Sequence, residues 1–295
     1  MTTCPNDHLQ TRFARVIAHI DAHADQQLDL AELAGIAAFS PFHFHRQFAA
    51  LFDITAPRYI RLVRMHRAAH SLLFRKDISI TDIAFDAGYE NAESFSHAFR
   101  KLHDQSPSDF RSHPDWDNWQ APYAKLQQVR RDTMSSTALN TVTIIDFPEI
   151  RTACLDHIGP PSRIGETIQR FIAWRKIHHL HPSKHATFNI LWCNPEDTPA
   201  DEFRMGLAVA TDHVLSEEDN KKGFYSQTLP AGRYAKLRHI GSDQTLRDSA
   251  LALYRDWLPQ SGETPRDFPL IFQRIAFYPD VAEHEAITDI LLPLA

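Results

Sequence analysis

The first hundred residues carry a pattern of apolar and polar positions that occurs twice. The apolar positions of residues 28–37 recur fifty positions later in residues 78–87, so that Leu33 is matched by Ile83. In each copy the apolar residues return every three or four positions, which is the period of one helix face. The pattern therefore predicts one structural unit that is used twice.

Each copy predicts two short helices around a tight turn. In the first copy Ser40 is followed by Pro41, the cap and the proline that commonly begin a helix. In the second copy Gly88 supplies the turn, and Asn91 caps a helix over about 92–103. Two helices joined in this way form a helix-turn-helix, whose second helix can enter the major groove of DNA.

A single long helical pattern separates the two copies. It runs from Pro57 to Phe74, and its polar face carries an arginine at every third position: Arg58, Arg61, Arg64 and Arg67. A helix of this length spans roughly 30 Å, close to the ~34 Å between successive major-groove entries on one side of B-DNA. Helical repeats also occur in protein-interaction modules, and an arginine stripe is commonly a solvated face, so the pattern alone leaves both interpretations open.

Composition narrows the class of protein but does not point to DNA. A length of 295 residues favours two domains. The formal net charge is −6, and residues 1–112 hold 12 Lys and Arg against 13 Asp and Glu, so DNA binding would depend on where the cations lie. The sequence has no apolar run of membrane-spanning length and no signal peptide, and Cys4, Cys154 and Cys193 have no metal or redox spacing. We therefore expect a cytoplasmic, nucleoid-associated protein with no membrane partner, no metal and no cofactor.

The second copy resembles the DNA-binding domain of the AraC/XylS family. The resemblance rests on the segments 82–89 and 95–100 within residues 78–111, together with residues 33–48 of the first copy. It covers residues ~8–113. It implies an all-α domain of seven helices with two helix-turn-helix units that binds double-stranded DNA.

The same resemblance assigns base-contacting positions to both recognition helices. On the first they fall at Phe42, His45 and Arg46; an arginine can donate two hydrogen bonds to guanine, and an aromatic ring can pack on a thymine methyl group. Core packing is the alternative for Phe42. We expect the inward face of this helix to hold Phe44, Phe48 and Leu51.

On the second recognition helix the corresponding positions are Ala92, Glu93 and His97. Family members commonly carry arginine where His97 stands and glutamines near the other two, so this departure weakens base reading by the second helix. Contacts to DNA phosphates are expected from seven cations along the predicted domain: Arg61, Arg64, Arg75, Lys76, Arg100, Lys101 and Arg111.

A second duplication fills the other half of the chain. Residues 114–139 lack a sustained period and are predicted to be a linker between domains 8–113 and 140–295, with a short helix or strand packed on a domain as one option. Beyond it, residues 147–159 align at an offset of 82 with residues 229–241, and both end in His-Ile-Gly. Each copy is followed by a helical stretch that ends in tryptophan, which predicts an α+β domain with duplicated halves.

Residues 140–295 resemble the GyrI-like effector-binding domain family, most specifically over residues 229–241 and 288–294. The resemblance implies an aromatic-lined pocket between the halves that binds a small-molecule effector. Its candidate residues are Trp192, Tyr225, Phe272, Gln273 and Tyr278, with core packing as the alternative. The family often has glutamate where Gln273 stands, and a neutral amide favours neutral or amphipathic effectors over lipophilic cations.

The sequence thus predicts a multidomain chain, an all-α double helix-turn-helix domain followed by an α+β duplicated GyrI-like domain. The predicted function is sequence-specific transcription regulation controlled by an effector, with RNA polymerase as a possible partner and a monomer or homodimer as the assembly. An enzyme is disfavoured because Gln273 is no base, and hydrogen bonding in turns is the expected role of His157 and His239. The alternative is a small-molecule-binding or hydrolytic protein whose DNA binding is weak or lost.

Overall fold

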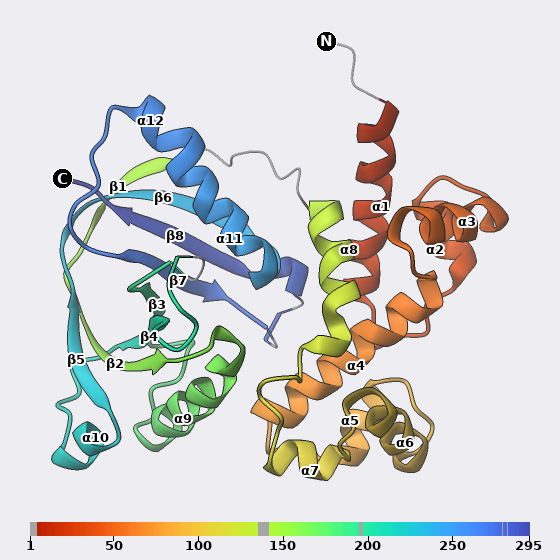
Figure 1. Ribbon diagram of the computed structural model, residues 1–295, viewed down its shortest axis with the longest axis horizontal. Coiled ribbons are helices and arrows are strands. Elements are labelled where there is room, and N and C mark those ends of the chain that lie inside the picture. The colour runs from red at the N-terminus through yellow and green to blue at the C-terminus, as the bar shows by residue number, and fades with distance from the viewer. Residues whose placement is uncertain (1–4, 135–141, 195–196, 279, 282) are drawn as a thin grey trace. The chain divides into compact units, whose positions relative to one another are not determined.

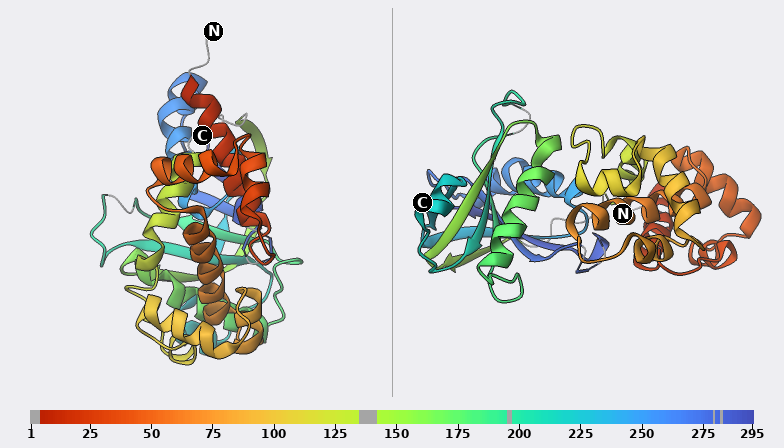
Figure 2. Two further views of the ribbon diagram at one scale, coloured as in Figure 1. Left: turned by 90° about the vertical axis from the view of Figure 1, so that its right-hand side faces the viewer. Right: turned by 90° about the horizontal axis from the view of Figure 1, so that it is seen from below.

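The chain divides into two compact units, residues 1–137 and residues 138–295. The computed structural model describes residues 5–134, 142–194, 197–278, 280–281 and 283–295. Figure 1 and Figure 2 show that the first unit is built from helices and the second from a sheet with helices on it. The predicted multidomain architecture is therefore confirmed.

The N-terminal unit contains two helix-turn-helix pairs on either side of a long helix (Figure 1). The first pair is α2 (Leu30–Ile36) and α3 (Pro41–Phe52), the long helix is α4 (Ala56–Phe74), and the second pair is α5 (Ile80–Asp86) and α6 (Ala92–His103). The unit also contains α1 (Pro5–Ala22), α7 (Pro107–Ser112), a 3-10 helix at Ala121–Tyr123 and α8 (Ala124–Met134).

The helices begin where the side-chain caps predict. The Asp29 carboxylate accepts a hydrogen bond from the backbone N–H of Ala31, and Asn91 accepts one from Ser94. In the turns between the paired helices, Gly88 and Ala38 both have positive φ, +80° and +55°. Only glycine adopts this conformation without steric cost, so the second turn is the less strained of the two.

The core of the N-terminal unit extends past the predicted domain end at residue 113. The structure corrects the predicted linker over its described part, because Trp116, Trp119, Tyr123 and Leu126 are buried in the same cluster as the helix-turn-helix residues. The Tyr123 hydroxyl donates to the carbonyl of Met65 at 3.0 Å. Residues 135–139 of the predicted linker lie outside the described residues.

The C-terminal unit is an eight-stranded sheet in which every described pairing is antiparallel. Its strands are β1 (Thr143–Phe147), β2 (Ile150–Ile158), β3 (Thr187–Leu191), β4 (Arg204–Ala210), β5 (Phe224–Leu229), β6 (Gly232–Ile240), β7 (Leu270–Ala276) and β8 (Ile287–Pro293). Its helices are α9 (Ile164–Ile177), α10 (Glu217–Lys221), α11 (Asp243–Ala252), which continues as a π-helical turn over Leu253–Trp257, and α12 (Leu258–Ser261), with 3-10 turns at Pro161–Arg163 and Glu283–Glu285.

The strand order β1-β6-β8-β7-β3-β4-β2-β5 reads the same from either end once the duplication is taken into account. Strand β2 corresponds to β6, β4 to β8, and β3 to β7, so the pseudo-twofold axis passes between β3 and β7. The first strand of each half pairs with a strand of the other half: β1 pairs with β6, and β5 pairs with β2. The predicted α+β duplication is confirmed.

The two faces of this sheet differ in what covers them. On one face Phe171 and Trp174 of α9 pack on β2, and Leu246 and Leu253 of α11 and its continuation pack on β6 and β8. The third apolar cluster, on the opposite face, contains no helix residue. The rings of Phe147 in β1 and Phe188 in β3 lie 6.4 Å apart although three strands separate them, so the sheet curls around this face.

Among the described residues, no helix combines the length and the apolar character needed to cross a membrane.

Candidate DNA-binding and effector-binding surfaces

Helix α3 buries one row of aromatic residues and exposes a polar face. Phe44, Phe48 and Phe52 are buried at four-residue spacing. The prediction that Leu51 faces the core is wrong: Leu51 is 39% exposed and Phe52 takes the inward position. With these three rings buried, the opposite side of α3 is exposed to solvent.

All three predicted base-contacting residues of α3 are exposed. Phe42 is 61% exposed, which excludes core packing as its role. The guanidinium carbon of Arg46 lies 4.4 Å from the Phe42 ring centroid, within cation–π range. His45 is exposed beside them. The pair presents a planar donor and an apolar ring side by side, the two chemistries that read guanine and the thymine methyl group.

Helix α6 has the same scaffold with a different outer face. It buries Phe95 and Phe99, exposes Glu93 and His97, and leaves Ala92 half-buried. Its first turn carries an acid and its last turn three basic residues, Arg100, Lys101 and His103. This face offers little for base recognition and concentrates cations at one end.

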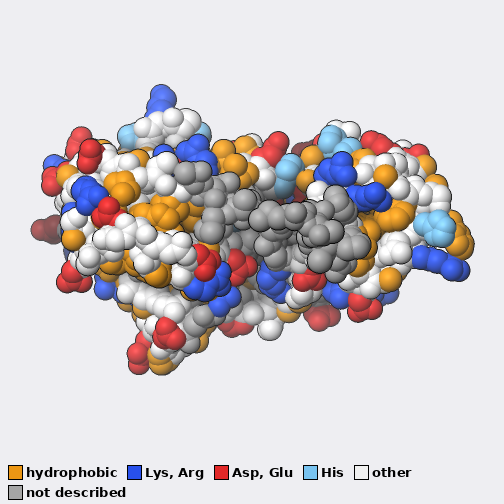
Figure 3. Space-filling model, turned by 90° about the horizontal axis from the view of Figure 1, so that it is seen from above, with side chains coloured by type: hydrophobic (Ala, Val, Ile, Leu, Met, Phe, Trp, Pro, Cys, Tyr) orange, Lys and Arg blue, Asp and Glu red, His pale blue; other side chains and the backbone are white. Residues whose placement is uncertain are grey.

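The predicted phosphate contacts fall into two groups. Arg61, Lys76, Arg100 and Lys101 are exposed, and Arg75 is half-buried at the end of α4. On the face of the molecule drawn in Figure 3, basic side chains stand among acidic and apolar ones rather than in one continuous patch.

The other two predicted cations have partners inside the unit. Arg64 donates from Nε to the carbonyl of Ala24 at 2.6 Å and from Nη2 to that of Gln26 at 2.7 Å. Arg111 donates to the carbonyl of Ile78 at 2.8 Å. A charged donor satisfied by a carbonyl is worth more to the fold than an exposed one, so these two side chains stabilise the loop after α1 and the start of α5.

In the C-terminal unit, one row of paired residues crosses seven strands on the curled face. From β6 to β5 the row reads Arg238, Asp289, Gln273, Phe188, Ala208, Cys154 and Tyr225. Directly opposed residues share a face of the sheet. The row therefore brings the predicted effector residues Gln273 and Tyr225 onto one surface, with an apolar middle and polar ends.

An arginine–carboxylate pair lies at each end of this row. Arg238 donates from Nε and Nη2 to the two carboxylate oxygens of Asp289 at 2.7 and 2.8 Å, and this bonding raises the pKa of Arg238. At the other end, Asp156 accepts from Arg204 Nε at 2.6 Å and from the Tyr225 hydroxyl at 2.8 Å.

The duplication relates one residue of each pair, Asp156 and Arg238, with the sign of the charge exchanged. Each has its ionic partner on the neighbouring strand, β4 or β8. Asp289 lies directly opposite Arg238, whereas Arg204 lies two positions along β4 from the residue opposite Asp156. Sequence analysis missed these four residues. The offset of 82 that matches Asp156 with Arg238 is a signal for these two residues, but not for Arg204 and Asp289.

Trp192 lies just beyond β3 beside the Asp156–Arg204 pair. The guanidinium carbon of Arg204 lies 4.7 Å from the Trp192 ring centroid. The indole N–H is buried and has no hydrogen-bond acceptor among the described residues. A buried donor without a partner costs about 1–3 kcal/mol, which a ligand that accepts the bond would recover.

The remaining predicted effector residues lie elsewhere. Phe272 faces the helix-covered side, in one cluster with Leu246 and Leu253, so it does not share a surface with Gln273. Adjacent strand residues point to opposite faces, which makes this split unavoidable. Tyr278 is half-buried in the segment after β7.

The two histidines at strand ends make the hydrogen bonds expected in turns. His157 contacts the Thr167 hydroxyl at 2.9 Å and the Pro160 carbonyl at 3.1 Å, and His239 contacts the Ser249 hydroxyl and the Ser242 carbonyl. Both rings are buried.

The Cys154 thiol on β2 is also buried. Burial raises the pKa of this thiol to about 12, so it stays protonated.

Comparison with known proteins assigns a family to each unit. A family model for GyrI-like small molecule binding domains matches residues 140–295, and one for helix-turn-helix domains matches residues 33–113. The Escherichia coli (strain K12) protein YgiV, described as a probable transcriptional regulator, is 34% identical over 155 residues, which cover 52% of this chain and 96% of YgiV. The regulatory protein SoxS of the same organism is 38% identical over 96 residues, which cover 32% of this chain and 89% of SoxS.

Among solved structures, the C-terminal domain of EcmrR matches 53% of this chain and 98% of its own, with 16% sequence identity and a TM-score of 0.44. The family assignment rests on the sequence matches. The chain belongs to the family of GyrI-like small molecule binding domains and carries an AraC-type helix-turn-helix domain ahead of that domain, so it is a DNA-binding transcription regulator with a ligand-binding domain.

Proposed function

We propose that the chain binds duplex DNA with α3 and α6 in successive major grooves and that α3 reads the bases. The observation that carries this proposal is the exposed Arg46–Phe42 pair on a recognition helix whose other face is fully buried. Helix α4 has 19 residues, about 28 Å of rise, which suits two helices that enter the major groove one helical turn of DNA apart.

The second helix, α6, is proposed to position the chain rather than to read sequence. Phosphate contacts from Arg100 and Lys101 at its end, and from Arg61, Arg75 and Lys76, would fix its register on the duplex. We leave Arg64 and Arg111 out of this set because their guanidinium groups already bond to backbone carbonyls. His45 is proposed to contact a base beside Arg46, and Ala92, Glu93 and His97 to border the groove with little discrimination.

The effector is proposed to be a neutral or amphipathic small molecule bound on the curled face of the C-terminal sheet. The cross-sheet row supports this class, because it offers apolar side chains between polar ends. The carboxylates of Asp156 and Asp289 are each compensated by an arginine, and Gln273 is uncharged. A lipophilic cation would meet no uncompensated negative charge at these residues, and burying it would be costly.

A hydrolytic role is the weaker proposal. The residue at the position of the family's glutamate is Gln273, which cannot accept a proton, and the Cys154 thiol is held in its protonated form. His157 and His239 are committed to turn hydrogen bonds.

Control of transcription by the effector requires that DNA-bound and free states bind it with different affinity. We propose that this coupling changes the availability of the DNA-binding unit or a contact to RNA polymerase. Two helix-turn-helix units in one chain make a monomer sufficient for two grooves, and a homodimer is the alternative.

An electrophoretic shift tests the DNA proposal. The full chain is titrated against the DNA upstream of its own coding region and against a scrambled duplex of equal length and composition. We expect tighter binding to the upstream region, by at least tenfold at fixed salt. Equal binding to both duplexes would contradict sequence-specific recognition and favour the alternative of a small-molecule-binding protein.

A thermal-shift screen tests the effector proposal. It compares neutral amphiphiles with organic cations that have the same hydrocarbon skeleton. We expect only the neutral compounds to raise Tm in the natural chain, and Gln273→Glu to gain a response to the cations; Gln260→Glu, at an exposed position of α12, is the matched control. A natural chain that responds only to hydrophobic cations would contradict the proposal.

A further inference from the structure

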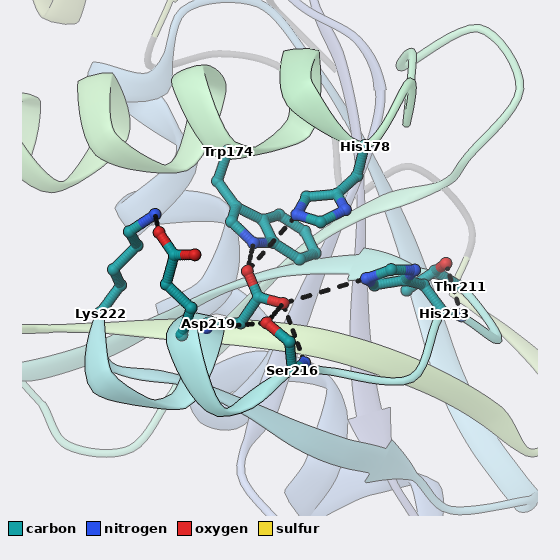
Figure 4. Close-up of polar contacts among 8 residues, drawn as sticks. Trp174, His178, Thr211, His213, Ser216, Asp219 and Lys222 are labelled. Carbon is teal, nitrogen blue, oxygen red and sulfur yellow. Dashed lines mark hydrogen bonds and ion pairs between the residues drawn. The ribbon is translucent and has the colours of Figure 1, made fainter.

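Three metal-ligating side chains from separate segments converge beside helix α9 (Figure 4). His178 follows the end of α9, His213 lies in the connection between β4 and α10, and Asp219 belongs to α10. His178 and His213 are 35 positions apart in the sequence, so no short motif announces the cluster. Neither the DNA-binding proposal nor the effector proposal uses these residues.

The three candidate ligand atoms lie close together, slightly farther apart than around a bound zinc ion. His178 Nε2 lies 3.4 Å from Asp219 Oδ1, and His213 Nε2 lies 4.0 Å from Asp219 Oδ2. All three ligand atoms lie within 4.8 Å of one another. Bonds of about 2.0–2.1 Å in a tetrahedral zinc site place the ligand atoms about 3.3 Å apart, so small side-chain adjustments would close the site.

The carboxylate is buried and held in place by neighbours. Asp219 is 4% exposed, Trp174 donates from Nε1 to its Oδ1 at 2.6 Å, and Ser216 donates to its Oδ2 from both its hydroxyl and its backbone N–H. Hydrogen bonds that orient a ligating carboxylate in this way are typical of metal sites. Oδ1 accepts one hydrogen bond and so retains a lone pair for an ion, whereas Oδ2 already accepts two from Ser216.

The imidazoles approach the carboxylate from the solvent side. Figure 4 shows both rings turned toward Asp219. Their centroids lie 4.4 Å apart with an interplanar angle of 50°, so they do not stack face to face. The His178 side chain is 21% exposed and that of His213 is 36% exposed, which leaves a route by which an ion and a water molecule can enter.

We propose that His178, His213 and Asp219 form a binding site for a divalent transition metal of the zinc class, with water as the fourth ligand. Two imidazoles and one carboxylate suit zinc, cobalt, nickel and copper, whereas magnesium and calcium prefer sites made of oxygen atoms alone. A bound ion joins the end of α9 to α10 and to the loop before it, and so fixes the segment that covers Trp174 and Phe224.

Cobalt(II) is the probe for this site, because a four-coordinate cobalt ion absorbs visible light through its d–d bands. The full chain, stripped of metal by a chelator and dialysed, is titrated with cobalt and then with zinc. We expect one equivalent of cobalt to produce the band, one equivalent of zinc to abolish it, and zinc to raise Tm by several degrees.

The variant His213→Ala removes an exposed ligand without disturbing the core, and we expect at least a tenfold loss of cobalt and zinc affinity. His179→Asn is the matched control: His179 is exposed next to His178, and its positive φ of 56° is one that asparagine tolerates. We expect it to bind as the natural chain does. Absence of the band in the natural chain, or equal binding by His213→Ala, would overturn the proposal.

Discussion

Helices α3 and α6 have the same length, the same kind of N-cap and the same buried aromatic spacing, yet their outer faces have little in common. The first presents Arg46 against Phe42, whereas the second presents Glu93, then His97, and ends in cations. The two copies share the residues that form the core and differ in the residues on the exposed face. This difference is the basis of our proposal that the first copy reads bases and the second positions the chain.

The two halves of the C-terminal unit also differ, in the charge that they carry at a matched position. Its two halves keep the strand order and the strand-end histidines, but the position of Asp156 in one half is occupied by Arg238 in the other, so the charge there is reversed. Duplicated backbones thus carry divergent chemistry in both units. In each unit the divergence lies on the face that we assign to a ligand, and the conserved part lies in the core.

The largest effect should come from the part that the two copies share. Phe48→Ala and Phe99→Ala remove fully buried rings at equivalent positions, and each should lower the free energy of unfolding by about 3–5 kcal/mol. Urea denaturation of the full chain measures this. Phe85→Ala, at a residue that is 52% exposed, is the control and should change it by less than about 0.5 kcal/mol. Unequal losses at the two core positions would break the comparison.

The next effect separates the two outer faces. Arg46→Ala should cost about 1–3 kcal/mol on a high-affinity duplex and little on a scrambled one, because a lost base contact removes discrimination. Glu93→Ala on α6 should leave the ratio of the two affinities nearly unchanged. Fluorescence anisotropy at fixed salt measures both variants. Equal losses on both duplexes for Arg46→Ala would reassign that residue to phosphate binding.

A titratable group distinguishes the two copies at their last residue. Helix α3 ends in Phe52, whereas α6 ends in His103, whose ring stacks on Phe99 and bonds the Tyr123 hydroxyl at 2.7 Å. Burial, aided by the charge of His66, lowers the pKa of His103 to about 4, against about 6.5 in an unfolded chain. Between these two values the unfolded chain binds a proton that the folded chain does not, so stability falls as pH falls through the window.

At pH 5.5 this proton should cost the natural chain between about 1 and 2 kcal/mol relative to pH 7.5. His103→Phe, which restores the residue of the first copy, should lose less stability over the same interval. His43→Gln, at an exposed histidine of α3, should retain the full loss. Urea unfolding curves at the two pH values give the comparison, and an unchanged pH dependence in His103→Phe would count against it.

The smallest effect is the one expected of a positioning cation. Lys101→Ala should weaken binding to every duplex by less than about 1 kcal/mol and reduce the slope of log affinity against log salt by about 1. Lys184→Ala, an exposed lysine of the C-terminal unit, changes the net charge equally and should leave the slope unchanged. A sequence-dependent loss for Lys101→Ala would make α6 a reader as well.

Much of the fold was within reach of the sequence, because repeats, caps and periodicity are local signals. The segment after residue 113 was not recognised, although Trp116, Trp119, Tyr123 and Leu126 have the three- and four-residue spacing of a buried face. The polar residues and turn formers around them interrupt the period and favour a linker. Helix α8, which contains Leu126, packs its apolar face on the core of the N-terminal unit, and the sequence does not show that contact.

The site residues were harder to predict for a physical reason. Arg64 looked like one more arginine on an exposed stripe, because its partners are backbone carbonyls about forty residues earlier, and a carbonyl has no signature in the sequence. Gln273 and Tyr225 were identified, but the row that joins them depends on a register across four strand pairings. For Phe272 the sequence left core packing open as the alternative, and the structure places it in the helix-covered core, because adjacent strand residues point to opposite faces.

Selection of bound duplexes from a random library tests the central account, in which one copy reads bases and the other positions the chain. For the natural protein we predict a site with two contacted segments about 10–10.5 base pairs apart, with nearly all sequence preference in one of them. Selection with Arg46→Ala should abolish the preference in that segment. Equal preference in both segments, or a preference that survives Arg46→Ala, would contradict the account.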